Sequence, residues 1–134
     1  MNLFQSLNFK SHSGLDLTWK IETDALTALE WYTLSQMILE LSVPFRNVIG
    51  IPRGGVKLGQ QLNKYGTGIP TDPILIVDDV LTTGGSMEEF KQKEQNVVNS
   101  DYIGWVVFAR NTPPKWCKAL FQMPFNPNLW IVNE

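Results

Sequence analysis

One stretch indicates the fold of this 134-residue chain: Ile74-Leu75-Ile76-Val77-Asp78-Asp79-Val80-Leu81-Thr82-Thr83-Gly84-Gly85-Ser86-Met87. Residues 74–77 are an unbroken apolar run rich in β-branched side chains, which is typical of a strand buried on both faces. Two acidic residues and a polar, glycine-containing turn follow the run. Ser86 and Glu89 have the spacing of a capping box, so we expect a helix from Ser86 to about Gln95. The stretch therefore predicts a strand, a loop and a helix.

A similar unit precedes this one. The short apolar run at residues 47–51 predicts a buried strand, and the loop Pro52-Arg53-Gly54-Gly55 follows it. We expect the next helix to span Val56 to Tyr65 and to end at Gly66, since glycine is common just after a helix.

A helix is also expected before these two units. Thr27 and Glu30 have capping-box spacing, and apolar residues at helical spacing continue to Leu41. Pro44 ends this helix, because proline restricts its predecessor and cannot continue a helix.

Beyond the units, Ile103–Ala109 predicts another strand. We expect residues 110–134 to be mostly irregular because they hold four prolines, with a last strand considered at Leu129–Val132. Residues 1–22 show no clear pattern apart from a turn signal at Ser13-Gly14. The order of elements predicts one α/β domain over residues 1–134, with a central parallel sheet flanked by helices. Ligands are then expected at the carboxyl ends of the strands.

The composition excludes several classes of protein. The chain is 43% hydrophobic and 18% charged, which excludes disorder over most of its length. A formal net charge of −2 does not favour nucleic acid as a partner. With one cysteine and one histidine, neither an internal disulfide nor a zinc cluster is expected, and Cys117 is interpreted as a small buried residue. No apolar run approaches a membrane span and no signal peptide is visible, so we expect a cytoplasmic protein without a membrane partner.

The residues after the strand at 74–77 suggest a ligand. A helix N-terminus offers free backbone N–H groups and the positive end of the helix dipole, and the hydroxyls of Thr82, Thr83 and Ser86 add donors. These features favour a phosphate. The carboxylates of Asp78 and Asp79 would repel a phosphate unless the ligand also carries hydroxyls or a metal ion. A ribose 5-phosphate satisfies both requirements.

Residues 74–87 resemble the phosphoribosyl diphosphate (PRPP) signature of the type I phosphoribosyltransferases. The segment VIGIPRGGVKLG at residues 48–59 is similar to the pyrophosphate loop of that family. Its Arg-Gly-Gly form resembles the purine-base enzymes of bacteria, in which the peptide bond before the arginine can be cis. Here that bond is Pro52–Arg53.

The resemblance implies transfer of a nucleobase to PRPP with release of pyrophosphate, in a protein that forms a homodimer. It implies that Arg53, Gly54 and Gly55 bind pyrophosphate, with Arg53, Asp78 and Asp79 as the catalytic residues. Asp78 and Asp79 would hold the ribose and, through water, Mg²⁺. The remaining PRPP-binding residues would hold the 5-phosphate: Thr82, Thr83, Gly84, Gly85 and Ser86.

The terminal segments resemble two different branches of the family. Phe9–Asp24 loosely resembles the orotate branch, with His12-Ser13-Gly14 at its turn, whereas Leu129–Ile131 resembles a base-stacking segment of bacterial xanthine–guanine enzymes. Thr82 stands where some purine enzymes have an aspartate, and this favours orotate over a purine. The candidate base-binding residues are His12, Arg110, Trp130 and Ile131.

The chain also departs from the family pattern. Only 24 residues lie between Arg53 and Asp78, where family enzymes usually hold another strand and a long mobile loop. Three alternatives follow: a minimal enzyme, an enzyme closed by a partner subunit, or a regulatory protein that binds PRPP or a nucleotide without turnover. A hydrolase or salvage enzyme that acts on a nucleotide is a further alternative.

Overall fold

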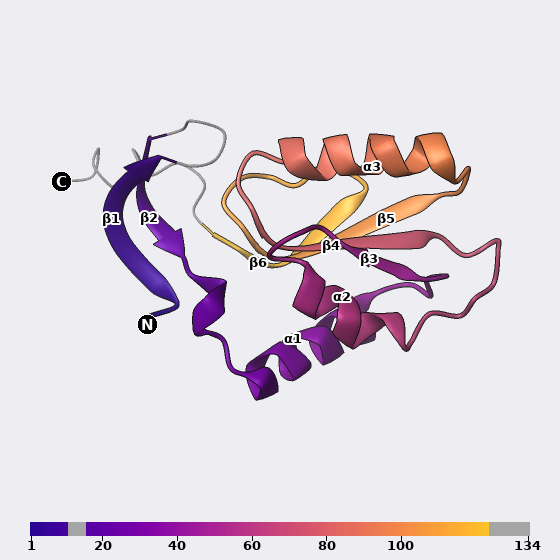
Figure 1. Cartoon of the computed structure of the whole chain (residues 1–134), viewed down its shortest axis with the longest axis horizontal. Coiled ribbons are helices and arrows are strands. Elements are labelled where there is room, and N and C mark those ends of the chain that lie inside the picture. Colours follow the sequence, from indigo (N-terminus) through magenta and orange to yellow (C-terminus); the bar gives the residue numbers. More distant parts are fainter. Residues whose placement is uncertain (11–15, 124–134) are drawn as a thin grey trace.

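A four-stranded parallel sheet forms the centre of the computed structural model, which describes residues 1–10 and 16–123 (Figure 1). The spatial order of its strands follows the sequence: β3 (Val48–Gly50), β4 (Ile74–Leu81), β5 (Tyr102–Ala109) and β6 (Cys117–Gln122). Two helices cover one face and a third covers the other: α1 (Ala28–Leu41) and α2 (Val56–Asn63), opposite α3 (Gly85–Val97). The predicted parallel α/β architecture is confirmed.

An antiparallel hairpin precedes the sheet, made of β1 (Phe4–Lys10) and β2 (Asp16–Ile21). A single 3₁₀ turn, η1 (Thr23–Ala25), connects it to α1. The hairpin lies beside the sheet, at the end where β4 and β5 finish (Figure 1). The sequence pattern did not indicate this hairpin. The expected turn at Ser13-Gly14 and the strand considered at Leu129–Val132 lie outside the described residues.

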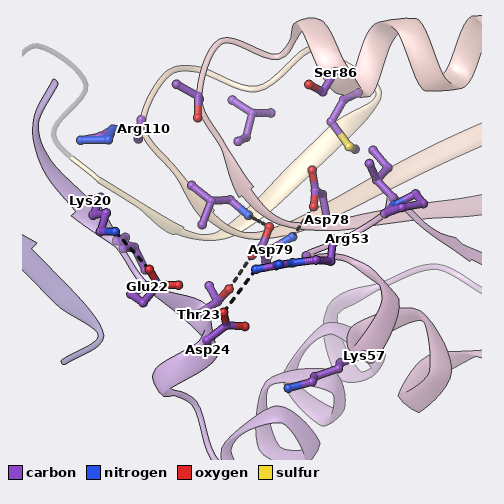
Figure 2. Close-up of a pocket in the computed structure, with 18 of the residues that line it drawn as sticks. Lys20, Glu22, Thr23, Asp24, Arg53, Lys57, Asp78, Asp79, Ser86 and Arg110 are labelled. Atoms are coloured by element: carbon purple, nitrogen blue, oxygen red, sulfur yellow. Dashed lines mark hydrogen bonds and ion pairs between the residues drawn. The ribbon is translucent and has the colours of Figure 1, made fainter. Parts of the chain in front are cut away.

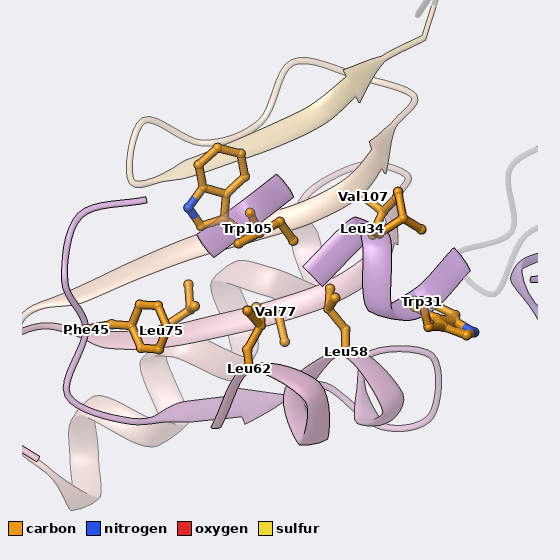
Figure 3. Packing of buried hydrophobic residues seen from close by; sticks show 10 residues of the cluster. Trp31, Leu34, Phe45, Leu58, Leu62, Leu75, Val77, Trp105 and Val107 are labelled. Atoms are coloured by element: carbon orange, nitrogen blue, oxygen red, sulfur yellow. The ribbon is translucent and has the colours of Figure 1, made fainter. Parts of the chain in front are cut away.

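The core has two layers because β4 is buried on both faces. Leu75 and Val77 pack with α1 and α2, as Figure 3 shows, and Ile74 and Ile76 pack on the side of α3. All four side chains are at most 3% exposed, which confirms the interpretation of the apolar run. Burial of each such side chain contributes about 1.5–3 kcal/mol. The core therefore fixes the position of the carboxyl end of β4.

The start of α1 agrees with its capping signal. The Thr27 hydroxyl accepts a hydrogen bond from the Glu30 amide at 3.2 Å, and the Glu30 carboxylate accepts one from the Thr27 amide at 2.8 Å. Both halves of the capping box are therefore present.

The other two helices differ from expectation at their ends. The helix α2 ends at Asn63 instead of Tyr65, and Gly66 does not have a positive φ. A side chain at Gly66 would place its Cβ 2.6 Å from the Arg46 carbonyl oxygen, so this glycine permits a close backbone approach. The helix α3 begins at Gly85, its N-cap is Gly84, and no side chain caps it. The proposed capping box at Ser86 is thus wrong.

The strand β6 corrects the prediction of an irregular segment after residue 109. It spans Cys117–Gln122 and pairs in parallel with β5. Two of the four prolines that suggested irregular structure, Pro113 and Pro114, lie in the connection before the strand, and the other two lie outside the described residues. Cys117 is buried, as expected. Within the described residues, no helix is both long and apolar enough to cross a membrane.

Candidate functional site

A cleft of about 970 Å³ lies at the carboxyl ends of β3, β4 and β5 (Figure 2). Most of its lining comes from the end of β2 with the segment after it, the loop after β3 with the start of α2, the end of β4 with the loop into α3, and the first residue after β5; Trp31 of α1 completes it. The polar lining residues are Lys20, Glu22, Thr23, Asp24, Arg53, Lys57, Asp78, Asp79, Thr82, Thr83, Ser86 and Arg110. The structure thus brings both sequence motifs to one cavity.

The loop after β3 lies close against β4 because it contains two glycines. A Cβ on Gly54 would collide with the Asp79 carboxylate, and a Cβ on Gly55 would lie 2.5 Å from the Val77 carbonyl oxygen. The peptide bond between Pro52 and Arg53 is cis, as the resemblance predicted. Arg53 and Gly54 line the cleft. Gly55 is buried behind them, and its amide donates to the Ile51 carbonyl at 2.8 Å, so it serves packing.

The two aspartates belong to β4 instead of following it, because the strand continues to Leu81. The amide of Asp79 donates to the Asp78 carboxylate at 2.8 Å, and the amide of Val80 donates to the Asp79 carboxylate at 2.7 Å. Burial, and after it the negative charge of the neighbouring Asp79, raise the pKa of Asp78 to about 8. At neutral pH the ligand-free pair therefore carries about one negative charge fewer than two free carboxylates would.

The loop after β4 leads into α3 through a left-handed residue. Gly84 has a φ of +88°, a conformation that favours glycine, and it forms the N-cap of α3. The side chain of Asn111 donates to the Thr82 carbonyl at 2.5 Å, which fixes the start of the loop from outside. Thr82, Thr83, Gly84 and Ser86 line the cleft, whereas Gly85 does not. The loop therefore presents hydroxyls and a helix N-terminus to the cleft, which suits an anion.

The segment after β2 adds residues that the sequence did not single out for a site. The Thr23 hydroxyl donates to the Asp79 carboxylate at 2.5 Å, and the Asp24 carboxylate forms an ion pair with Arg53 at 3.4 Å (Figure 2). Their partners lie 56 and 29 residues away in the sequence. No local pattern could have indicated these contacts.

Arg110 connects the hairpin to the sheet. Its guanidinium lies 3.5 Å from the centroid of the Trp19 ring, and it also donates a hydrogen bond to the Trp19 carbonyl. The side chain is 6% exposed, and burial lowers its pKa. Arg110 is therefore not a plain surface charge, and it lines the cleft. The other candidate base-binding residues, His12, Trp130 and Ile131, lie outside the described part of the chain.

The donor set fits a magnesium ion only in part. Among the described residues, no three acidic, histidine or cysteine side chains gather into a metal cage. Mg²⁺ is commonly held by one or two carboxylates together with phosphate oxygens of a substrate. Asp78 and Asp79 meet that requirement if the ligand brings the phosphates.

No protein-family model and no curated protein matches the sequence. Several solved structures have the same fold. An orotate phosphoribosyltransferase from Aeropyrum pernix matches with a TM-score of 0.73 and 16% identity, over 90% of this chain and 88% of that one. An orotate phosphoribosyltransferase from Mycobacterium tuberculosis H37Rv, solved in complex with Fe(III) dicitrate, matches with a TM-score of 0.68 and 14% identity. The match covers 91% of this chain and 90% of that one.

A third similar structure is a hypothetical protein from Neisseria gonorrhoeae with bound ppGpp. It has a TM-score of 0.52 and 14% identity, over 73% of this chain and 81% of that one. At such identities a likeness establishes the fold alone. The chain has the fold of the type I phosphoribosyltransferases.

Proposed function

We propose that this chain is a phosphoribosyltransferase that joins a nucleobase to PRPP and releases pyrophosphate. Orotate is the favoured base and a purine is the second candidate. The observation that carries the proposal is the convergence of Arg53, the Asp78–Asp79 pair and residues 82–86 on one cleft. A sugar diphosphate with a further phosphate requires this combination of a cation, hydroxyl acceptors and an anion site.

Each part of PRPP has a proposed partner in the cleft. The hydroxyls of Thr82, Thr83 and Ser86 and the N-terminus of α3 bind the 5-phosphate. Asp78 and Asp79 accept hydrogen bonds from the ribose hydroxyls. Arg53 binds the pyrophosphate, which requires that its exposed ion pair with Asp24 opens. Exposed ion pairs contribute only about 0–1 kcal/mol, so the pair does not prevent binding.

The reaction forms a bond between C1 of the ribose and a nitrogen of the base. The bond from C1 to the pyrophosphate oxygen breaks, and its electron pair leaves with the pyrophosphate. The base nitrogen loses its proton to solvent. Mg²⁺ held by Asp78, Asp79 and the substrate would neutralise charge on the leaving group. The protein groups contribute by positioning and by electrostatic stabilisation of a positively charged ribose.

Two features support an acidic base such as orotate. Thr82 offers no carboxylate that could take a proton from a purine nitrogen. Arg110 brings a cation to the cleft wall, where an anionic base would be attracted.

Pyrophosphate release in the presence of Mg²⁺ and PRPP tests the proposal. The bases are orotate, uracil, xanthine, guanine, hypoxanthine and adenine, each assayed alone, with a reaction that lacks any base as the control. We expect release with orotate above that control. Release with a purine alone would assign the transferase to the second substrate class. No release with any base would contradict a transferase.

A regulatory protein that binds PRPP or a nucleotide is the second candidate function. Between Arg53 and Asp78 only Gly54 and Lys57 line the cleft, so this interval supplies no cover for a reaction centre. The similar protein from Neisseria gonorrhoeae has ppGpp bound, which extends the comparison to a nucleotide ligand. Binding of PRPP or of a nucleoside monophosphate without turnover would favour this candidate.

A second copy of the chain is the proposed source of cover for the cleft. We propose a homodimer in the cytoplasm, because a partner could supply the element that this interval lacks. Sedimentation at equilibrium tests the dimer. A monomer at the concentrations used for the activity assay would contradict it.

A further inference from the structure

The carboxylate of Asp79 is held on several sides. One oxygen, Oδ1, accepts the Val80 amide at 2.7 Å, and the other, Oδ2, accepts the Thr23 hydroxyl at 2.5 Å. Gly54 lies against the same carboxylate, where any larger residue would collide with it. A carboxylate can accept about four hydrogen bonds, so acceptor sites remain for a ligand. The contacts leave the group one preferred orientation.

Thr23 is itself held in place. It is 7% exposed, begins η1 one residue beyond the end of β2 and reaches a carboxylate on a different sheet. The next residue, Asp24, pairs with Arg53 in the loop after β3. Figure 2 shows both contacts extending from this short segment toward the cleft. The Thr23 hydroxyl is therefore a fixed donor rather than a rotating surface group.

We infer that Thr23 is a positioning residue, which orients the Asp79 carboxylate so that its remaining acceptor sites meet the ribose hydroxyls of the ligand. This inference rests on the proposed function, since it assigns the ribose to Asp79. Thr23 acts through Asp79 and makes no contact with the reacting atoms. Loss of its hydroxyl leaves Oδ2 without this donor, so the carboxylate is held less firmly and ordering it for the ligand costs binding free energy.

The test compares three variants with the wild-type protein. Thr23→Val keeps the shape of the side chain and removes the donor, whereas Thr23→Ser keeps the donor. Thr33→Val is the matched control, because Thr33 lies on the exposed face of α1 and its hydroxyl bonds only the Leu29 carbonyl. Calorimetry measures two dissociation constants for each protein: that of PRPP with Mg²⁺ and that of inorganic phosphate.

We expect Thr23→Val to raise the dissociation constant of Mg–PRPP roughly tenfold, as for loss of a hydrogen bond to a charged group. The constant for inorganic phosphate should stay unchanged, because the Thr23 hydroxyl donates to Asp79 in β4 and the phosphate is assigned to residues 82–86. Thr23→Ser should restore affinity to near the wild-type value. A general loss of structure would lower the affinity for both ligands and lower the melting temperature, and this result would overturn the inference.

A double-mutant cycle with Asp79→Asn gives a second readout. If Thr23 acts through Asp79, Thr23→Val has no further effect on PRPP affinity once Asp79 is replaced. Full additivity of the two substitutions would overturn the positioning role. Equal PRPP affinity in wild type and Thr23→Val would overturn it as well, while the proposed function stood. A wild-type protein that binds no Mg–PRPP would overturn the proposed function and the inference together.

Discussion

The loops after β3 and β4 line the same cleft as the segment from Lys20 to Asp24, but different forces position them. The loops follow β3, which is half-buried, and β4, whose apolar run is buried on both faces, so the core fixes them and their glycines permit close packing. The segment continues a hairpin outside the parallel sheet, and polar contacts join the two to Asp79, Arg53 and Arg110. A site can thus combine a rigid part with a part that a few contacts hold in place.

Replacement of Gly84 by valine should break the rigid part and have the largest effect. A β-branched residue is strained at a φ of +88°, so the start of α3 must shift. We expect phosphate affinity to fall about 100-fold in a calorimetric titration. Gly68→Val is the matched control, because Gly68 has a φ of +70° in a loop away from the cleft. Equal phosphate affinity in Gly84→Val and wild type would show that phosphate does not bind at the loop after β4.

Asp79→Asn should have the next largest effect, because Asp79 is where the two parts meet. The substitution removes a charged acceptor, so we expect Mg–PRPP to bind about tenfold more weakly or worse. Inorganic phosphate should bind as before. Asp72→Asn serves as the control, since Asp72 accepts a hydrogen bond from Thr67 in a loop that does not line the cleft. Unchanged affinity for Mg–PRPP would contradict the proposal that Asp79 binds the ribose.

Trp19→Ala should loosen the hairpin without affecting the parallel sheet. Trp19 stacks on Phe4 with ring centroids 5.4 Å apart and lies under Arg110. A two-stranded hairpin is marginally stable alone, so loss of these contacts should raise amide exchange in β1 and β2 several-fold. Exchange mass spectrometry can compare these strands with β4 and β5. Equal acceleration in both sheets would show that the two parts unfold as one.

The raised pKa of Asp78 predicts a smaller effect on stability. In the folded protein the pKa of Asp78 is about 8, so its proton is kept up to about that pH, whereas the unfolded chain loses it near the ordinary pKa of 3.8. Between these values the folded state binds more protons, so the free energy of unfolding should fall as pH rises. After discounting for partial solvent screening we expect a fall of about 2 kcal/mol between pH 5 and pH 8.

Denaturant unfolding of wild type and Asp78→Asn in EDTA measures this effect. The free energy of unfolding of the wild type minus that of Asp78→Asn should decrease from pH 5 to pH 8. A difference that stays constant over that range would contradict a raised pKa at Asp78.

Local sequence patterns were sufficient for three of the four strands of the sheet, β3, β4 and β5, and for both loops. The apolar run before Asp78 predicted a strand buried on both faces, and the capping box at Thr27 predicted the start of α1. The helix boundary at Ser86 was wrong because a positive φ at Gly84 replaced a side-chain cap. The strand β6 was missed because its pairing with β5, and not its own pattern, determines its structure.

The hairpin side of the cleft could not be predicted in the same way. Thr23 and Asp24 are ordinary polar residues in the sequence, and only folding brings them to Asp79 and Arg53. Arg110 follows β5 in an expected place, but its burial against Trp19 depends on a segment 91 residues away. Contacts at such separation leave no periodic or spacing signal in a single sequence.

The central claim is that both parts form one PRPP site, and a ¹⁵N-labelled sample titrated with PRPP and Mg²⁺ tests it most directly. We expect the affected backbone amide signals to be those of residues 20–24, 53–54 and 78–86. All of them should reach saturation at the same PRPP concentration. Inorganic phosphate alone should shift only the amides of residues 82–86. Changes confined to another surface, or no change at millimolar PRPP, would contradict the account.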